Sequence, residues 1–506
     1  MDALQQIQDL IGAGIAPSAW AQDARMRAEK TARFRRYHDG DFDHQMTAEM
    51  RRLANMTRGE FGANYCQKVI AAEADRLRVS TIDASGGKVD PKTGKSEASS
   101  WVQDVMDWNR FDALQIDLHE NALIDAESYM LVSWDNDKQR VVLTQEMAYD
   151  GTEGIVPIYR RSDTREMYGA VKIWHETRVA YADTIRVNVY LPGEIKRYIG
   201  ETNGNLSLMA APDKWEMADG KPIGVPIIAF SNRGRGRNPY GLSELESVTP
   251  LQDQLIRHMY SMTVAAEIGS TGIRWAKGFE PPKNLTIGMW VEIAPDGLPE
   301  GAVAEVGRLE GSPLEPYVMI CNWTIEQILN ISGTPMPSAA GAGASGEALK
   351  QRESDLIAKC ERFQIKIGNA WEDVFDLAWR VQSAYSTQKP PVYDRFYCKW
   401  RSPQTRNEKD TVDNVLKVKD LVGETEAIRL LAAVFDYDEA TVNEIIAAKR
   451  QASADALRMM NQESVNLFST PDTSRPINGN GKKPATGTGD LASMTSNEGA
   501  NASPVG

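Results

Sequence analysis

The sequence is poor in the features that mark most enzymes, membrane proteins and disulfide-stabilised domains. Only four of its 506 residues are cysteine and five are histidine, and neither set has the spacing of a metal site. No G-x-S-x-G, H-E-x-x-H or EF-hand loop occurs, and no run approaches the roughly 18 apolar residues of a membrane helix. These absences leave catalysis, cofactors, metals and membrane insertion without positive support. The residues concerned are Cys66, Cys321, Cys360, Cys398, His38, His44, His119, His175 and His258.

The cysteines and the first residues favour a cytosolic chain. No C-x-x-C pair occurs, and Cys321 and Cys360 fall on apolar helical stripes, so we expect reduced core residues. The first ten residues, M-D-A-L-Q-Q-I-Q-D-L, are acidic and amphipathic, whereas a secretory signal has a basic region followed by an apolar one. Acidic pairs such as Asp41 and Asp43 are interpreted as turn and surface residues.

Acidic residues outnumber basic ones in this sequence. The formal net charge is −13, which argues against a protein whose whole surface binds nucleic acid, because phosphate binding needs clustered Lys and Arg. A surface that nucleic acid merely passes is still compatible with this charge. One local cluster, Arg233, Arg235 and Arg237, could bind nucleic acid, but we favour a loop that pairs with acidic neighbours or with an adjacent subunit.

A glycine- and alanine-rich stretch, P-M-P-S-A-A-G-A-G-A-S-G at 335–346, is the most informative feature present. It has no charge and almost no side chain, which suits backbone that passes close to something without gripping it. A flexible linker is the plainer alternative. Gly341, Gly343 and Gly346 also spell G-x-G-x-x-G, but a helical pattern precedes them instead of a strand, and no phosphate-binding Lys follows, which disfavours a nucleotide site.

The longest helical pattern in the chain follows this stretch directly. Ser345 can cap its start, and Glu347 in the first turn complements the helix dipole. A helix of about 40 residues would be roughly 60 Å long, which suits a strut in a large assembly better than a compact enzyme domain. The apolar stripe comprises Leu349, Leu356, Cys360, Phe363, Ile367, Trp371, Val374, Ala378 and Val381.

Before this helix, the chain predicts an α+β region followed by a stalked module. Helices are expected at 21–37, 64–76, 101–108 and 114–127, and antiparallel strands begin at Tyr129. Two capping boxes, Ser243 with Glu246 and Thr249 with Gln252, predict a helix that starts, kinks and restarts before running to about residue 268. A small β-containing module at 271–310 then separates it from a second helix, 314–331.

After the long helix, the sequence predicts a strand at 393–400 and helices at 408–422, 424–435 and 438–460. From about residue 470 the composition turns to Asn, Gly, Ser, Thr and Pro with almost no large apolar side chain, which predicts a disordered tail.

Several stretches, in order, resemble the portal proteins of tailed bacteriophages, specifically the family similar to the portal of phage SPP1. None is decisive alone, but the ordered set spans about four-fifths of the chain. The stretches are N-Y-C-Q-K-V-I-A-A-E-A-D-R-L at 64–77, D-A-E-S-Y-M-L-V at 125–132, V-P-I-I-A-F-S-N-R, G-L-S-E-L and L-Q-D-Q-L within 225–255, S-G-E-A-L-K-Q-R-E-S-D-L at 345–356, and A-W-E-D-V-F-D-L-A at 370–378.

The resemblance implies an α+β, portal-type fold assembled as a ring, usually of twelve subunits. The implied parts are an α+β wing (1–240), a stem helix (241–269), a clip (270–311), a second stem helix (312–332), a tunnel loop (333–346), a long wing helix with its return strand (347–404), a helical crown (405–468) and a disordered tail (469–506) that maps onto no family role.

The resemblance further implies a non-enzymatic conduit for double-stranded DNA at the capsid's portal vertex, assembled in the host cytoplasm, without cofactor or membrane. Its implied partners are copies of itself, the terminase large subunit, head-tail adaptor proteins, and capsid and scaffolding proteins. The alternative is a head-tail or scaffolding component without a DNA channel. The implied sites are the tunnel loop (Ser338, Ala339, Ala340, Gly341, Ala342, Gly343, Ala344, Ser345) and the partner-docking clip (Arg274, Trp275, Lys277, Trp290, Glu292, Asp296).

Overall fold

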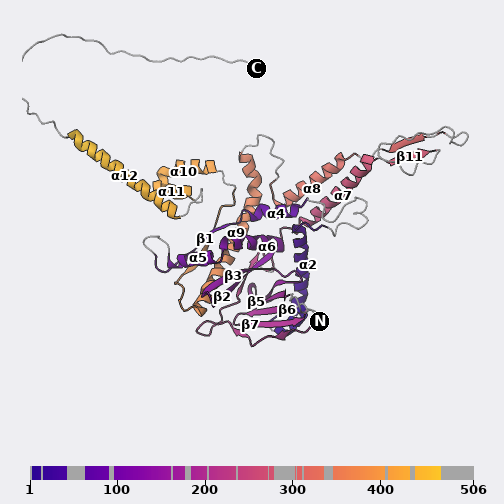
Figure 1. Cartoon of the computed structure of the whole chain (residues 1–506), viewed down its shortest axis with the longest axis horizontal. Coiled ribbons are helices and arrows are strands. Elements are labelled where there is room, and N and C mark those ends of the chain that lie inside the picture. The colour runs from indigo at the N-terminus through magenta and orange to yellow at the C-terminus, as the bar shows by residue number, and fades with distance from the viewer. Residues whose placement is uncertain are drawn as a thin grey trace, which may run out of the picture. The chain divides into compact units, whose positions relative to one another are not determined.

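The structure is a computed structural model with mixed α and β content, and it divides into two compact units, Met1–Gln404 and Thr405–Gly506 (Figure 1). It describes residues 3–12, 15–42, 63–89, 96–160, 163–176, 184–201, 204–234, 238–271, 273–277, 303, 305–309, 313–335, 346–404, 408–432 and 439–468. None of the helices described is long and apolar enough to cross a membrane.

The main core of the first unit forms where two helices pack on a three-stranded antiparallel sheet. The strand order is β10-β2-β3, and both α6 and α9 contact the sheet. The predicted long helix exists: α9 begins at Gly346 and has 40 residues, and its stripe is buried from Leu356 to Val381. The elements are β2 (Glu127–Asp135), β3 (Arg140–Met147), β10 (Ile227–Ser231), α6 (Phe111–Asp125) and α9 (Gly346–Tyr385).

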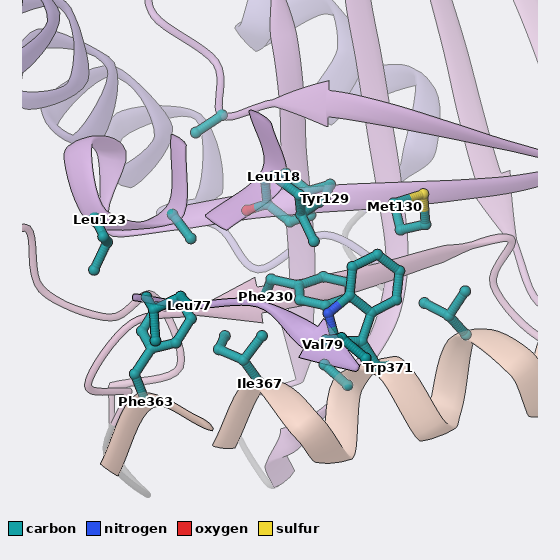
Figure 2. Close-up of a cluster of buried hydrophobic side chains, with 14 of the residues drawn as sticks. Leu77, Val79, Leu118, Leu123, Tyr129, Met130, Phe230, Phe363, Ile367 and Trp371 are labelled. Carbon is teal, nitrogen blue, oxygen red and sulfur yellow. The ribbon is translucent and has the colours of Figure 1, made fainter. Parts of the chain in front are cut away.

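Trp371 of α9 lies at the centre of this core (Figure 2). Its ring centroid is 4.7 Å from that of Phe111 and 4.9 Å from that of Phe230. Its indole Nε1 donates to Nε2 of His119 over 3.0 Å, while Nδ1 of His119 is 3.1 Å from the Leu77 carbonyl oxygen. Burial lowers the pKa of His119 to about 3, so this imidazole is neutral and serves the core.

A two-stranded ribbon covers part of the same core. β1 (Val79–Ser85) pairs antiparallel with β13 (Arg395–Trp400). β13 is the return strand expected near 393–400, whereas the sequence reasoning missed β1 and placed the first strand at Tyr129. Three further helices pack in this region: α2 (Trp20–His38), α4 (Tyr65–Ala74) and α5 (Glu97–Trp108). The predicted helix at 101–108 therefore begins earlier, with Ser96 accepting from the Ser99 N–H as its N-cap.

A second core lies between a larger antiparallel sheet and the amino-terminal helices α1 (Ala3–Ile11) and α2. Trp20 joins the two because its indole Nε1 donates to the Pro157 carbonyl over 3.0 Å. The sheet follows the order β4-β5-β6-β7-β8, and β9 pairs with β7. Its strands are β4 (Gly154–Arg160), β5 (Asp163–Glu176), β6 (Thr184–Leu191), β7 (Glu194–Glu201), β8 (Ser207–Leu208) and β9 (Asp213–Lys214).

A pair of helices, α7 (Thr249–Thr271) and α8 (Glu315–Ser332), packs together and carries the strands β11 (Ile273–Lys277) and β12 (Glu305–Leu309) beyond it (Figure 1). The two strands pair antiparallel. The expected stalk with a β-containing module is therefore present in its described parts. Residues 278–302 of that module lie outside the described residues.

The prediction of two capping boxes was wrong, although α7 does begin at Thr249, where the second box placed the restart of the helix. Residues 244–248 form turns, and α7 begins only at Thr249. Ser243 Oγ accepts from the Leu245 N–H over 3.0 Å. The buried amide of Gln252 points to another part of the chain: it donates to the Ala63 carbonyl and accepts from the Tyr65 N–H. Long-range hydrogen bonds thus use the side chain that a local cap would need.

The second unit is helical in its described residues. Its helices are α10 (Glu408–Val422), α11 (Glu424–Ala432) and α12 (Glu439–Phe468). α10 matches the prediction, α11 is described as far as Ala432 while the predicted 433–435 lie outside the described residues, and α12 extends eight residues past the predicted 460. A small core of Ala432, Val442 and Ile446 holds the unit together. The predicted tail from residue 469 lies outside the described residues.

Candidate functional site

The predicted tunnel loop is described only at its two ends. Residues 336–345, which include all eight residues proposed for the channel, lie outside the described residues, as does the predicted cap Ser345. The described ends are the carboxyl end of α8, through residue 335, and the start of α9 at Gly346. The two helices that flank this loop are described, and their contacts hold the ends of the loop in place.

The end of α8 is closed by a glycine cap. Gly333 adopts a left-handed conformation with φ of 71°, which glycine reaches without a Cβ penalty. The Gly333 N–H donates to the Asn330 carbonyl and the Thr334 N–H donates to the Leu329 carbonyl. Ser332 Oγ donates to the Leu329 carbonyl at 3.1 Å, and it forms a second hydrogen bond, at 2.9 Å, with the Thr334 hydroxyl. The chain therefore leaves α8 along a fixed path.

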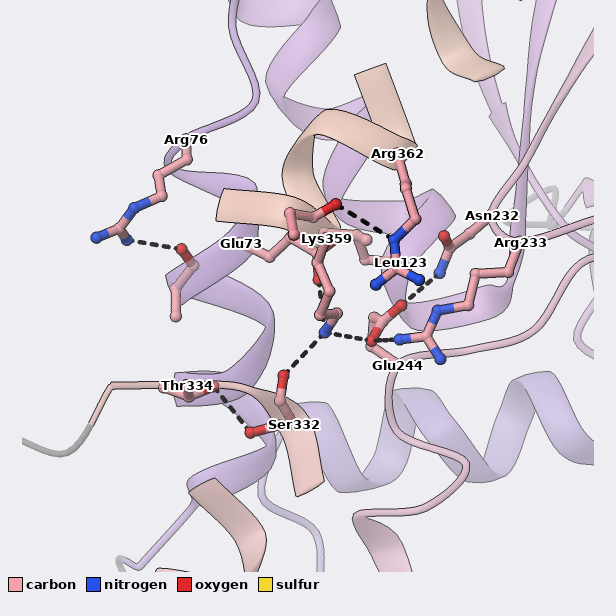
Figure 3. Close-up of polar contacts among 12 residues, drawn as sticks. Glu73, Arg76, Leu123, Asn232, Arg233, Glu244, Ser332, Thr334, Lys359 and Arg362 are labelled. Carbon is pink, nitrogen blue, oxygen red and sulfur yellow. Dashed lines mark hydrogen bonds and ion pairs between the residues drawn. The ribbon is translucent and has the colours of Figure 1, made fainter. Parts of the chain in front are cut away.

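Lys359 of α9 fastens this cap to the rest of the unit (Figure 3). Its ammonium Nζ donates to the Ser332 carbonyl oxygen over 3.0 Å. The same Nζ lies 3.0 Å from Glu73 Oε2 on α4 and 2.6 Å from Glu244 Oε2. The lysine side chain is 12% exposed and both carboxylates are 2% exposed. A single buried cation therefore joins α8, α9, α4 and the segment before α7.

Glu244 is held from a second side by the segment that follows β10. Asn232 Nδ2 donates to Glu244 Oε1 and to the Leu242 carbonyl, each over 2.9 Å. The Arg233 guanidinium also pairs with Glu244. Of the three arginines in the 233–237 cluster, Arg233 thus pairs with an acidic neighbour, as the favoured interpretation expected, while residues 235–237 lie outside the described residues.

The electrostatics of this cluster depend on burial. The pKa of Glu73 is raised to about 7: burial is the main cause, Glu244 acts in the same direction, and Lys359 and Arg233 oppose them. Burial alone would lower the pKa of Lys359, but the two carboxylates outweigh that effect and raise it. The lysine is therefore charged at neutral pH, and removing it would leave buried carboxylates without their main partner.

A second ion pair joins α9 to the turn that follows α4. Arg76, just beyond α4, is 3.4 Å from Glu353 of α9, one turn and a half before Lys359. The first turns of α9 with described side chains are therefore tied to α4 at two positions. Sequence reasoning did not single out Lys359, Glu73 or Glu244. The only signal was a Lys on the polar side of the α9 stripe, because its partners are remote in the sequence.

The predicted clip residues are partly described. Arg274 and Trp275 lie on β11, opposite Arg308 and Gly307 of β12. Lys277 is exposed, and its Nζ is 3.4 Å from Glu305 Oε2 on β12. Trp290, Glu292 and Asp296 lie outside the described residues. Three of the six therefore lie on one strand, and their role in docking a partner stays a prediction.

The described residues contain no cluster of His, Cys, Asp and Glu that could hold a metal ion. All four cysteines are free thiols, and three of them are buried, as the sequence predicted for Cys321 and Cys360. The cluster around Lys359 is fully engaged in holding four segments together. The role of this cluster is structural: it holds the end of α8, before the glycine-alanine stretch, against α9, which follows that stretch.

Comparison with known proteins adds independent findings. The family model described as phage portal protein, SPP1 Gp6-like, matches residues 86–455. The portal protein of Mycobacterium phage L5 is 27% identical over 214 residues, which cover 38% of this chain and 43% of that protein. The portal protein of Mycobacterium phage D29 is 27% identical over 191 residues, covering 36% and 39%. The chain thus matches less than half the length of these curated relatives.

Among solved structures, a chain in a structure titled "Neck of native GTA particle computed with C12 symmetry" aligns with a TM-score of 0.39 at 12% identity. The alignment covers 78% of this chain and 94% of that one.

Proposed function

The chain belongs to the SPP1 Gp6-like family of phage portal proteins, and from this premise we propose that it forms a ring at one vertex of a phage capsid. DNA enters the capsid through this ring during packaging and leaves through it during ejection. The ring docks the terminase large subunit and head-tail adaptor proteins, and it hydrolyses nothing itself. The family match over residues 86–455 carries the proposal, because that range includes the α7–α8 pair, the glycine-alanine stretch and α9.

The paired helices α7 and α8 support the roles of stem and clip. The proposed stem is 241–269 and 312–332, and the proposed clip is 270–311. Leu255, Ile256 and Ile328 are buried in the core of the unit, whereas Val318 and Met319 near the start of α8 are exposed. A helix pair rooted in the core and carrying two strands at its other end can present those strands to a partner.

The fixed ends of the glycine-alanine stretch support its role as a tunnel loop. A loop that lines a channel for moving DNA must keep its place while its middle makes only weak contacts. The Gly333 cap and the Lys359 cluster hold the segment before it. The uncharged middle adds almost no phosphate affinity, which would otherwise grow with each neutralised charge around the ring.

An Ala342→Arg variant tests this proposal, with Ala342→Ser as a matched neutral control. In a ring, the arginine would add one positive charge per subunit at the channel wall. We expect rings to assemble as in the wild type, DNA packaging into capsids to slow at least about tenfold, and the defect to ease as salt rises, since salt weakens phosphate contacts. Packaging at the normal rate by the arginine variant would show that this loop does not line the channel.

A further inference from the structure

A cavity on one side of α9 carries more positive than negative charge. It has a volume of about 220 Å³ and lies beside the Lys359 cluster. Four of its lining side chains are cationic and two are carboxylates, which leaves an excess of two positive charges. The charged lining residues are Arg233, Lys359, Arg362, Lys366, Glu73 and Glu244.

The excess positive charge of this cavity comes from two exposed residues of α9, Arg362 and Lys366. Lys359 and Arg233 neutralise the two carboxylates. Arg362 donates through Nε to the Ala358 carbonyl over 3.2 Å, and Lys366 donates to the Gly234 carbonyl. Neither has a carboxylate within ion-pair distance among the described residues. Like charges four residues apart on a helix are mildly destabilising, so an isolated subunit gains nothing electrostatically from this pair.

Further along α9 lies a groove of the opposite sign. It has a volume of about 770 Å³ and is lined by four carboxylates and one cation, an excess of three negative charges. Arg395 pairs with Glu372 over 3.1 Å, and Asp376 is held by Arg380 and Tyr393. Asp373 and Asp394 are exposed and have no charged partner among the described residues.

The two surfaces are built from different neighbours of α9. The segment after β10 and Glu73 of α4 complete the cationic cavity, whereas Tyr393, Asp394 and β13 complete the acidic groove. A ring of identical subunits needs two different surfaces on each copy, one complementary to the other. Opposite charges on two separate surfaces provide that complementarity, and they also select against wrong pairings.

We propose that the cationic surface of one subunit, at Arg362 and Lys366, contacts the acidic surface of a second copy of this chain, at Asp373 and Asp394. This inference rests on the proposed ring and names the charged contact between its adjacent subunits. Each surface carries charges that an isolated subunit does not neutralise, and a neighbouring copy supplies charges of the opposite sign.

Charge reversal on each surface, alone and together, tests the contact. The first variant carries Arg362→Glu and Lys366→Glu, the second carries Asp373→Lys and Asp394→Lys, and the third carries all four substitutions. Sedimentation velocity across a concentration series measures assembly of the full chain. We expect each two-residue variant to need about a hundredfold higher concentration to assemble, because juxtaposed like charges are strongly unfavourable. The four-residue variant should assemble nearly as the wild type does, because the contact is restored with its signs exchanged.

Matched controls keep the test decisive. Glu361→Lys reverses an exposed charge on the same helix outside both surfaces, and it should leave assembly unchanged. Circular dichroism and thermal unfolding establish that each variant folds. If a reversed variant fails to fold, the neutral pairs Arg362→Gln with Lys366→Gln and Asp373→Asn with Asp394→Asn replace it, each with an expected weakening of about tenfold.

The possible outcomes separate the contact from the ring itself. Wild-type assembly with loss in each reversed variant and recovery in the four-residue variant supports the contact. Normal assembly of either reversed variant, or no recovery in the four-residue variant, overturns the contact while the ring stands. A wild-type chain that stays monomeric overturns the ring, and the contact with it.

Discussion

Trp371 and Trp323 illustrate how differently two helices of the same unit use their apolar residues. Trp371 of α9 is completely buried in the main core, whereas Trp323 of α8 is 53% exposed. The comparison extends along both helices. The α9 stripe is buried from Leu356 to Val381, but Val318 and Met319 near the start of α8 face outward. The apolar stripe of α9 is thus buried within one subunit, whereas the outer part of α8 leaves apolar surface that a single subunit does not cover.

The largest effect should come from Trp371→Ala. The substitution removes a fully buried ring and the hydrogen bond to His119, so we expect the unfolding free energy to fall by about 4 kcal/mol. Urea denaturation followed by circular dichroism measures it. Trp323→Ala is the matched control, with an expected change of about 0.5 kcal/mol or less in the same measurement. Equal losses in the two variants would remove the distinction between the two helices.

Lys359→Met tests whether the anchored end of α8 depends on the buried cation. The variant leaves Glu73 and Glu244 without the ammonium that contacts both, so we expect a loss of about 3 kcal/mol in the unfolding free energy. Lys366→Met removes an exposed lysine of the same helix and should cost far less. Hydrogen exchange should also show weaker protection at residues 329–334. Unchanged protection there would mean that Lys359 does not hold the end of α8.

A smaller, pH-dependent effect is expected at Glu73. Its folded-state pKa of about 7 lies above the ordinary value of about 4.3, so the folded protein holds this proton more tightly than the unfolded chain does. The stabilisation is complete below the unfolded-state pKa and is lost as the pH rises through 7. Glu73→Gln cannot ionise.

The difference in unfolding free energy, wild type minus Glu73→Gln, should therefore fall by about 2–3 kcal/mol between pH 5 and pH 8. Asp125 and His119 also have shifted pKa values, but both variants contain them, so their contributions cancel. Glu361→Gln, at an exposed position of α9, provides the reference for a glutamate outside the cluster. A pH-independent difference would show that the Glu73 pKa is the same in the folded and unfolded states.

The same contrast explains what the sequence could predict. The α9 stripe repeats over about nine turns, so its period identifies the helix without knowledge of its partners. β1 was missed because V-S-T-I-D-A-S is short and largely polar, and its pairing partner β13 lies more than 300 residues away. Pairing over such a distance leaves no local pattern.

The cluster around Lys359 was missed for a related reason. Glu73, Glu244 and Lys359 each sit in a different segment, and each has the local setting of an exposed charge. Only the tertiary fold buries them together. Gln252 shows the converse case: its local setting predicted a capping box, and a long-range contact with Ala63 and Tyr65 decided otherwise.

An assembly would cover the exposed apolar surface of α8 and would neutralise the complementary charges along α9. Electron microscopy of the purified wild-type chain at micromolar concentration therefore tests the account most directly. We predict closed rings of one size with a central channel wide enough for a DNA duplex. A homogeneous population of monomers, or an assembly without a central channel, would contradict the proposal that this protein is a DNA conduit.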